Sequence, residues 1–153
     1  MAQRKKAKAR RFQVGFSPAA TAERKNLPAP VRAVMTKIVD RFYDEGCRAM
    51  GYALTGDLPW PKFCCTHFAS NWRIICAFPS PSQIVVVKIA PHTGESDPYL
   101  DMAVSLEEPP NTEPVKKGQC CEDGVAPILT ADEADHIYGA FRKVIQGNLS
   151  VTF

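Results

Sequence analysis

The sequence has no apolar run near the length of about 20 residues that a helix needs to cross a bilayer. We therefore expect neither a membrane span nor a membrane partner. Acidic residues are also missing before Glu23, and the basic opening segment runs into Phe12 without the apolar stretch of a secretory signal. These absences predict a cytoplasmic protein, with an organellar transit peptide as the open alternative.

The net charge of +3, from 19 Lys and Arg against 16 Asp and Glu, is unevenly distributed. Residues 1–11 hold six of the basic residues and no acid, so the rest of the chain is slightly acidic. Residues 47–106 hold four basic and four acidic residues, whereas residues 107–123 hold two basic and five acidic ones. The basic character therefore belongs to a tail, which we expect to be disordered.

A CxxC motif is also absent from the six cysteines, which fall as Cys47, Cys76 and the adjacent pairs Cys64-Cys65 and Cys120-Cys121. A zinc site would need Cys64, Cys65 and His67 with Cys120 or Cys121 as ligands. Neighbouring strand residues point to opposite faces, which argues against that set. We expect free thiols in a reducing cytosol, most of them small buried apolar residues, and neither a metal nor a cofactor.

At 153 residues the chain is about one domain long, and its patterning predicts an α+β fold. Alternating apolar residues predict a strand at 12–16. Apolar residues three and four positions apart predict a helix that begins at Asn26, as N-cap, and ends at Gly46. Three strand-like runs follow, at residues 62–68, 72–78 and 83–90.

Residues 107–130 are rich in proline and acid and have no periodicity, which predicts a long surface loop. Such a loop is an insertion, a partner-binding segment or a disordered stretch. Thr130 and Glu133 then have the spacing of a capping box. They predict a C-terminal helix over residues 131–146 that packs on a core formed by residues 12–106.

The hairpin between the last two predicted strands places two cations together. If residues 79–82 close it, antiparallel pairing puts Arg73 opposite Lys88. Facing cations are destabilising unless an anion lies between them, and a phosphate suits the planar guanidinium. The alternatives are that either cation reaches solvent or pairs with Asp97 or Asp101.

Three further residues have side chains suited to chemistry. His92 follows the last strand, and histidine is the side chain that most often serves as a general acid or base, so it is a candidate for that role. Tyr99 offers a hydroxyl and a ring on which a base can stack. His67, on the preceding strand, is a weaker candidate. For the first two the alternative is structural: a solvated turn histidine for His92, and a core position for Tyr99.

These stretches resemble the RelE/ParE toxin superfamily. Asn71–Phe78 is similar to the family's aromatic-Arg strand, Gln83–Ala90 to its Val/Ile-rich partner strand, and His92–Tyr99 to the polar segment that leads to a tyrosine. The opening strand to Phe16 and the Leu27–Phe42 helix are also similar. The resemblance covers about residues 12–106 and implies a RelE-like fold with an early strand, a helical segment, a curved antiparallel sheet and a C-terminal helix.

The resemblance implies a ribosome-dependent endoribonuclease that cleaves messenger RNA and is neutralised by a cognate antitoxin. In that function Arg73 stabilises charge on the phosphate, His92 exchanges protons, and Tyr99 stacks on or orients the nucleotide. Lys88 and His67 then bind substrate phosphate. The tail residues Arg4, Lys5 and Lys6 add basic charge for RNA.

The sequence also departs from the nuclease pattern. Residues 63–68 read Phe-Cys-Cys-Thr-His-Phe where such nucleases often present lysines, and Thr93 stands where an arginine is common. The alternative is therefore a non-catalytic RelE/ParE-fold binding protein, such as a gyrase-type inhibitor or a regulatory interaction module. A small structural domain that shares only the sheet is a third interpretation, and the oligomeric state stays open.

Overall fold

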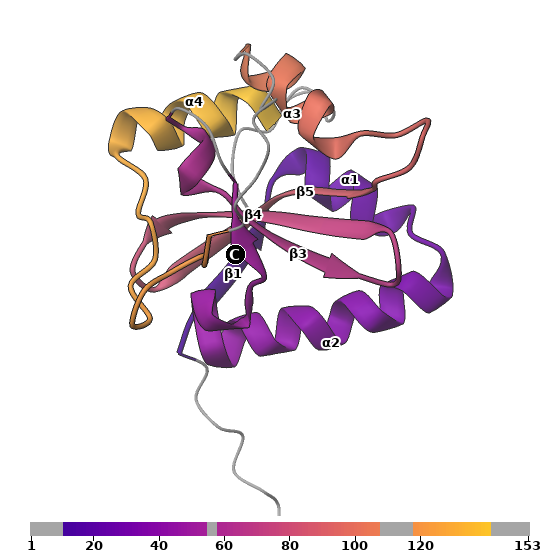
Figure 1. The fold of residues 1–153 in the computed structure, drawn as a ribbon, viewed down its shortest axis with the longest axis horizontal. Coiled ribbons are helices and arrows are strands. Elements are labelled where there is room, and N and C mark those ends of the chain that lie inside the picture. The colour runs from indigo at the N-terminus through magenta and orange to yellow at the C-terminus, as the bar shows by residue number, and fades with distance from the viewer. Residues whose placement is uncertain (1–10, 55–57, 108–117, 142–153) are drawn as a thin grey trace, which may run out of the picture.

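The computed structural model describes residues 11–54, 58–107 and 118–141. It is an α+β fold built on a five-stranded mixed sheet in the order β1-β5-β4-β3-β2 (Figure 1). The strands are β1 (Gln13–Phe16), β2 (Tyr52–Ala53), β3 (Cys64–Phe68), β4 (Trp72–Ser80) and β5 (Gln83–Pro91). The strands predicted at 12–16, 62–68, 72–78 and 83–90 are confirmed, whereas the short β2 was not predicted.

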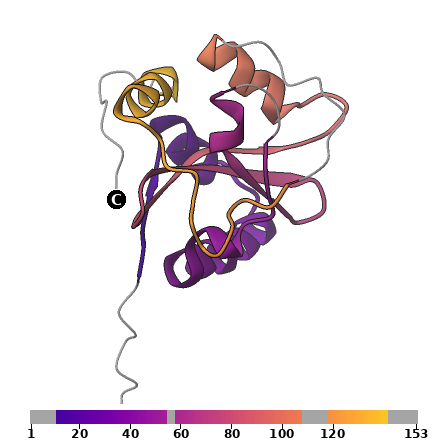
Figure 2. The same cartoon turned by 60° about the vertical axis from the view of Figure 1, so that its left-hand side comes forward.

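The helices cover both faces of this sheet. They are α1 (Pro18–Lys25), α2 (Ala29–Glu45), α3 (Pro98–Leu106) and α4 (Ala131–Phe141), with short 3-10 turns η1 (Gly46–Ala49) and η2 (Trp60–Lys62). Figures 1 and 2 show α2 along one face and α3 and α4 above the other. Met35, Val39 and Phe42 of α2 fill the first core layer, and Met102, Leu106 and Ile137 fill the second. Among the helices that the structure describes, none is long and apolar enough to cross a membrane.

The sheet is not antiparallel throughout. β2, β3, β4 and β5 pair antiparallel, but β1 pairs parallel with β5, from Gln13 beside Gln83 to Phe16 beside Val86. Short turns impose antiparallel pairing on consecutive strands, whereas the long connection between β1 and β5 leaves either direction open.

The helix predicted from Asn26 to Gly46 corresponds to α2, which begins at Ala29, whereas α1, which lies before it, was not predicted. Ser17 caps α1 because its hydroxyl accepts a hydrogen bond from the Ala20 amide, and Asn26 is the C-cap of α1 instead of the N-cap of α2. Pro28 separates the two helices and is the N-cap of α2. The end at Gly46 is confirmed, with φ +63° there.

Helix α3 was not predicted, because its nine residues are too few to show a clear helical period. Its N-cap is Asp97, whose Oδ1 accepts hydrogen bonds from the Tyr99 and Leu100 amides at 3.0 and 3.2 Å. The capping box before α4 is confirmed: the Thr130 amide donates to Glu133 Oε1, and the Glu133 amide donates to Thr130 Oγ1.

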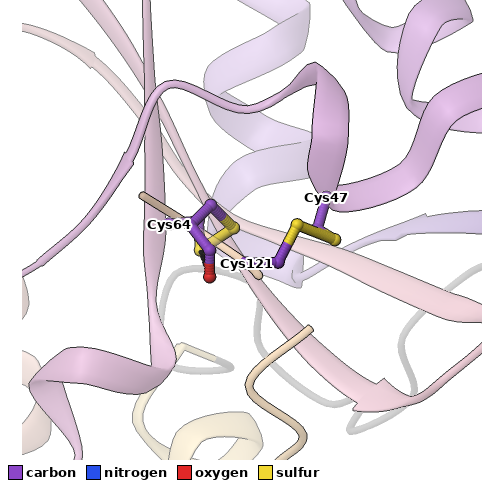
Figure 3. Close-up of a disulfide and its surroundings, with 4 residues drawn as sticks. Cys47, Cys64 and Cys121 are labelled. Atoms are coloured by element: carbon purple, nitrogen blue, oxygen red, sulfur yellow. Dashed lines mark hydrogen bonds between the residues drawn. A yellow bond between two sulfur atoms is a disulfide. The ribbon is translucent and has the colours of Figure 1, made fainter. Parts of the chain in front are cut away.

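The prediction of free thiols is wrong for four cysteines. Cys47 is bonded to Cys121 and Cys64 to Cys120 (Figure 3), whereas the buried Cys65 and Cys76 belong to neither bridge. The partners lie 74 and 56 positions apart in the sequence, so only the tertiary fold brings them together.

The bridges tie down the end of the predicted loop, residues 118–129, which we call the stapled segment. Gly118 pairs with Ala53 of β2 and Ile128 with Phe78 of β4. Ala126 and Ile128 pack against the α2-side core. Figure 2 shows the stapled segment in orange, running across the sheet toward α4. The tail residues 1–10, the loop residues 108–117 and the predicted helix end at 142–146 lie outside the described residues.

Candidate functional site

Polar side chains gather on the sheet face that lies under α3. The register pairs His67 with Arg73 and Arg73 with Ala90, and a second row pairs Tyr52 with Cys65. Residues directly opposite each other point to the same face. Cys65 packs with Met102 and other α3-side residues, so this face is the one covered by α3.

Tyr52 is the centre of a hydrogen-bonded chain on this face. Its hydroxyl oxygen lies 2.7 Å from His67 Nε2 and 2.8 Å from the Tyr99 hydroxyl oxygen. Cys65 Sγ lies 3.4 Å from the same Tyr99 oxygen. Tyr52 has one hydroxyl proton, so it donates along one of its two bonds and accepts along the other. The chain His67–Tyr52–Tyr99 can therefore pass a proton between an exposed imidazole and a half-buried phenol.

The two phenols are held in their neutral form. Burial raises the pKa of Tyr99 to about 12, and the nearby Cys65 adds to this, while a hydrogen bond from Arg73 partly opposes it. Burial raises the pKa of Tyr52 further still, with the hydrogen bond to Tyr99 as the next cause. Near neutral pH both hydroxyls are consequently proton donors and not bases.

Arg73 supplies the positive charge of the site. One guanidinium nitrogen, Nη1, donates to the Trp72 carbonyl oxygen at 3.1 Å. Its buried Nε has no hydrogen-bond partner among the described residues. No carboxylate in the described ranges lies within 4.0 Å of the guanidinium, so its charge is not neutralised there.

His92 stands at the rim of the same site, directly after β5. Its ring meets the Tyr99 ring edge-on, with centroids 5.3 Å apart and an interplanar angle of 85°. Its backbone amide donates to the Asn71 carbonyl oxygen at 2.7 Å, which holds it beside the start of β4. The side chain is exposed, so the imidazole is accessible to a substrate.

The predicted pairing of Arg73 with Lys88 is wrong. Arg73 faces Ala90, and Lys88 faces Ile75, because the turn begins after Ser80 and not after Phe78; the two register shifts, between Ala77 and Ser80 and between Ile75 and Cys76, cancel each other.

Lys88 instead forms ion pairs within the fold. Its Nζ lies 2.9 Å from Glu23 Oε2 and 3.7 Å from Asp101 Oδ2. The pairing with Asp101 was one of the predicted alternatives. Burial raises the pKa of Glu23, although the hydrogen bond and charge of Lys88 pull it down. The Lys88 charge is therefore paired with carboxylates of the fold and is not available to bind a phosphate.

Four of the residues predicted from the sequence lie together in this structure: His67, Arg73, His92 and Tyr99. Tyr52 and Cys65 complete the cluster and were missed. Tyr52 belongs to a strand of two residues, which is too short to leave an alternating pattern, so no signal in the sequence identifies it. Arg4, Lys5 and Lys6 lie outside the described residues.

The zinc alternative does not fit the arrangement. Cys64 and Cys120 are bonded to each other, and Cys65 lies in the core layer on the opposite side of the sheet from Cys64. Within the described ranges, no group of three or more His, Cys, Asp and Glu side chains has the arrangement of a metal site.

The candidate site is therefore a half-buried cluster of Arg73 and Tyr99 with the exposed His92 at its rim, and a proton-donor chain leads from Tyr99 to the exposed His67. The chain matches none of the known protein families and none of the curated proteins with which it was compared.

Proposed function

We propose that this protein is a RelE-like toxin, a ribosome-dependent endoribonuclease that cleaves messenger RNA. The observation that supports the proposal most is the convergence of Arg73, His92, Tyr99 and His67 on one sheet face beside Tyr52. These residues come from β2, β3, β4, the end of β5 and α3. An early strand, two helices and an antiparallel hairpin sheet also fit the RelE/ParE resemblance.

The cluster has the groups that RNA cleavage by an internal nucleophile requires. The ribose 2′-oxygen forms a bond to phosphorus while the bond to the 5′-oxygen breaks, which leaves a cyclic phosphate and a free 5′-hydroxyl. His92 accepts the 2′-hydroxyl proton. Arg73 stabilises the negative charge that develops on the phosphate. The neutral Tyr99 hydroxyl donates a proton to the departing oxygen.

Tyr52 connects this donor to a supply of protons. Its hydroxyl lies between Tyr99 and His67, and the His67 side chain is exposed. In the proposal, His67 takes up a proton from solvent and Tyr52 passes it on to Tyr99 after each cleavage. His67 therefore serves proton transfer instead of phosphate binding.

The proposed function implies partners and a location. The partners are a cognate antitoxin, the ribosome and messenger RNA, and the location is the cytoplasm. The basic residues Arg4, Lys5 and Lys6 supply phosphate contacts that the neutral core lacks.

One observation favours a second candidate function. Because Glu23 and Asp101 neutralise Lys88, the site offers fewer cations for RNA than its sequence implies. A RelE/ParE-fold protein that binds a partner protein without cleaving RNA needs fewer cations, and we keep it as the alternative.

The test is induced expression of the full chain, with mapping of the 5′ ends of translated messages. We expect growth arrest with cuts inside translated messages, relieved by Arg73→Ala, His92→Ala or Tyr99→Ala. Arg41→Ala is the matched control, since Arg41 is an exposed α2 residue paired with Glu45, and it leaves arrest unchanged. Arrest without cuts favours the binding protein, and normal growth rejects both functions.

A further inference from the structure

The two disulfides close a covalent ring that includes β2, the strand that carries Tyr52. Within the sheet, Ala53 of β2 lies directly opposite Cys64 of β3. On its other side the Ala53 amide donates to the Gly118 carbonyl oxygen at 3.1 Å. Two residues further on, Cys120 is bonded back to Cys64. β2 is thus held between β3 and the stapled segment, which are themselves joined covalently.

β2 depends on this arrangement because it is only two residues long. A strand of that length has few backbone hydrogen bonds of its own to fix its position. The second bridge reinforces the first, since Cys121 is bonded to Cys47 in η1, a few residues before β2. Cys47 lies before β2 and Cys64 after it, so the chain on both sides of β2 is bonded to the adjacent pair Cys120 and Cys121.

One of the bridges is accessible to a small thiol. A cleft of about 440 Å³ is lined by Cys47, Cys120 and Cys121, together with Arg48, Asp123 and Gly124. Cys121 is partly exposed, whereas Cys64 is fully buried. A thiolate in solution therefore meets the Cys47–Cys121 bridge first, in a cleft to which Arg48 adds positive charge.

We propose that the two bridges are a redox-sensitive latch that positions Tyr52, so that the site is assembled in the disulfide form and loosened in the thiol form. The inference rests on the proposed function for its effect on RNA cleavage, but its structural part stands alone. Each bridge takes two electrons and two protons from a dithiol reductant and becomes two thiols, while the dithiol becomes a disulfide. Disulfides of cytosolic proteins are usually transient and redox-sensing, which reconciles these bridges with the proposed location.

The test uses the full chain with and without dithiothreitol, with the number of free thiols counted by alkylation and mass spectrometry. Hydrogen exchange is measured on peptides that contain Ala53 and, as an internal reference, on peptides from β5. With all four cysteines reduced, we expect the Ala53 amide to exchange about tenfold faster, because the bridges no longer fix the Gly118 carbonyl oxygen to which it donates. Exchange in β5 is expected to be unchanged. RNA cleavage falls by about tenfold and returns on reoxidation.

The variants separate a latch from a general loss of stability. Cys47→Ser with Cys121→Ser, and Cys64→Ser with Cys120→Ser, each remove one bridge, and both double variants are expected to show faster Ala53 exchange. Cys76→Ala is the control, because Cys76 is a buried free cysteine on the α2 side, and its activity keeps the wild-type response to dithiothreitol.

Three results would overturn the latch: unchanged Ala53 exchange after full reduction, equal loss of protection across β5, or a purified protein whose four cysteines hold a metal ion. Faster Ala53 exchange in a protein that cleaves no RNA in either state supports the latch and rejects the nuclease instead.

Discussion

The hydroxyl oxygens of Tyr52 and Tyr99 lie 2.8 Å apart, although the two residues are 47 positions apart in the sequence. Tyr52 comes from the edge strand β2 and Tyr99 from the first turn of α3. Their contact joins the sheet to the helix above it and completes a donor chain that ends at His67.

Removing the Tyr52 hydroxyl should slow RNA cleavage without weakening RNA binding. In Tyr52→Phe the ring stays but the link between His67 and Tyr99 is broken, so we expect kcat to fall about tenfold or more while KM stays nearly constant. The measurement is steady-state cleavage of ribosome-bound messenger RNA by the full chain. Tyr43→Phe is the control, since it removes a hydroxyl that contacts the Val14 carbonyl, on the α2 side. Equal losses in both variants would count against the relay.

The raised pKa of Tyr99 predicts instability at alkaline pH. The unfolded chain releases the Tyr99 proton near its ordinary pKa of 10.0, whereas the folded protein keeps it until about 12. Stability from this group is therefore fully present below pH 10 and is lost as pH rises toward about 12. Denaturant unfolding of wild type and Tyr99→Phe across this window measures the effect. The variant should show the flatter dependence, and parallel curves would contradict the assignment.

Neutralising Glu23 should release Lys88 for RNA. In Glu23→Gln the 2.9 Å ion pair is lost and only the longer contact with Asp101 remains. We expect RNA affinity to rise about threefold to tenfold and the salt dependence to steepen by about one phosphate contact. Filter binding over a range of salt concentrations measures both. Adding Lys88→Ala should cancel the gain; a gain that persists would show that another cation is responsible.

Gly51 should tolerate no side chain because it lets β2 approach β3. A Cβ at Gly51 would lie 2.8 Å from the Cys65 carbonyl oxygen, which also accepts the Gly51 amide hydrogen bond. Gly51→Ala should therefore lower the free energy of unfolding by about 1–3 kcal/mol and displace Tyr52. Gly94→Ala is the matched control in the loop between His92 and Tyr99, where a Cβ meets nothing within 4 Å. Thermal unfolding and RNA cleavage of the two variants give the comparison.

Several features of the fold follow from local sequence. Alternating and continuous apolar runs identified β1, β3, β4 and β5 within a few residues, since side chains in a strand alternate between faces. Gly46 and the pair of Thr130 and Glu133 marked helix ends by local backbone chemistry. The residue types of Arg73, His92 and Tyr99 also marked them as candidates before their positions were known.

Only the tertiary structure decided how those residues meet. The hairpin turn begins after Ser80 and not after Phe78, which pairs Arg73 with Ala90 and leaves Lys88 to pair with Glu23; register depends on the turn and on both sheet faces at once. The disulfides join residues 56 and 74 positions apart, and spacing along a chain cannot reveal such pairings. Tyr52 has no local pattern of its own. It becomes the centre of the site because β3, α3 and the stapled segment surround it in space.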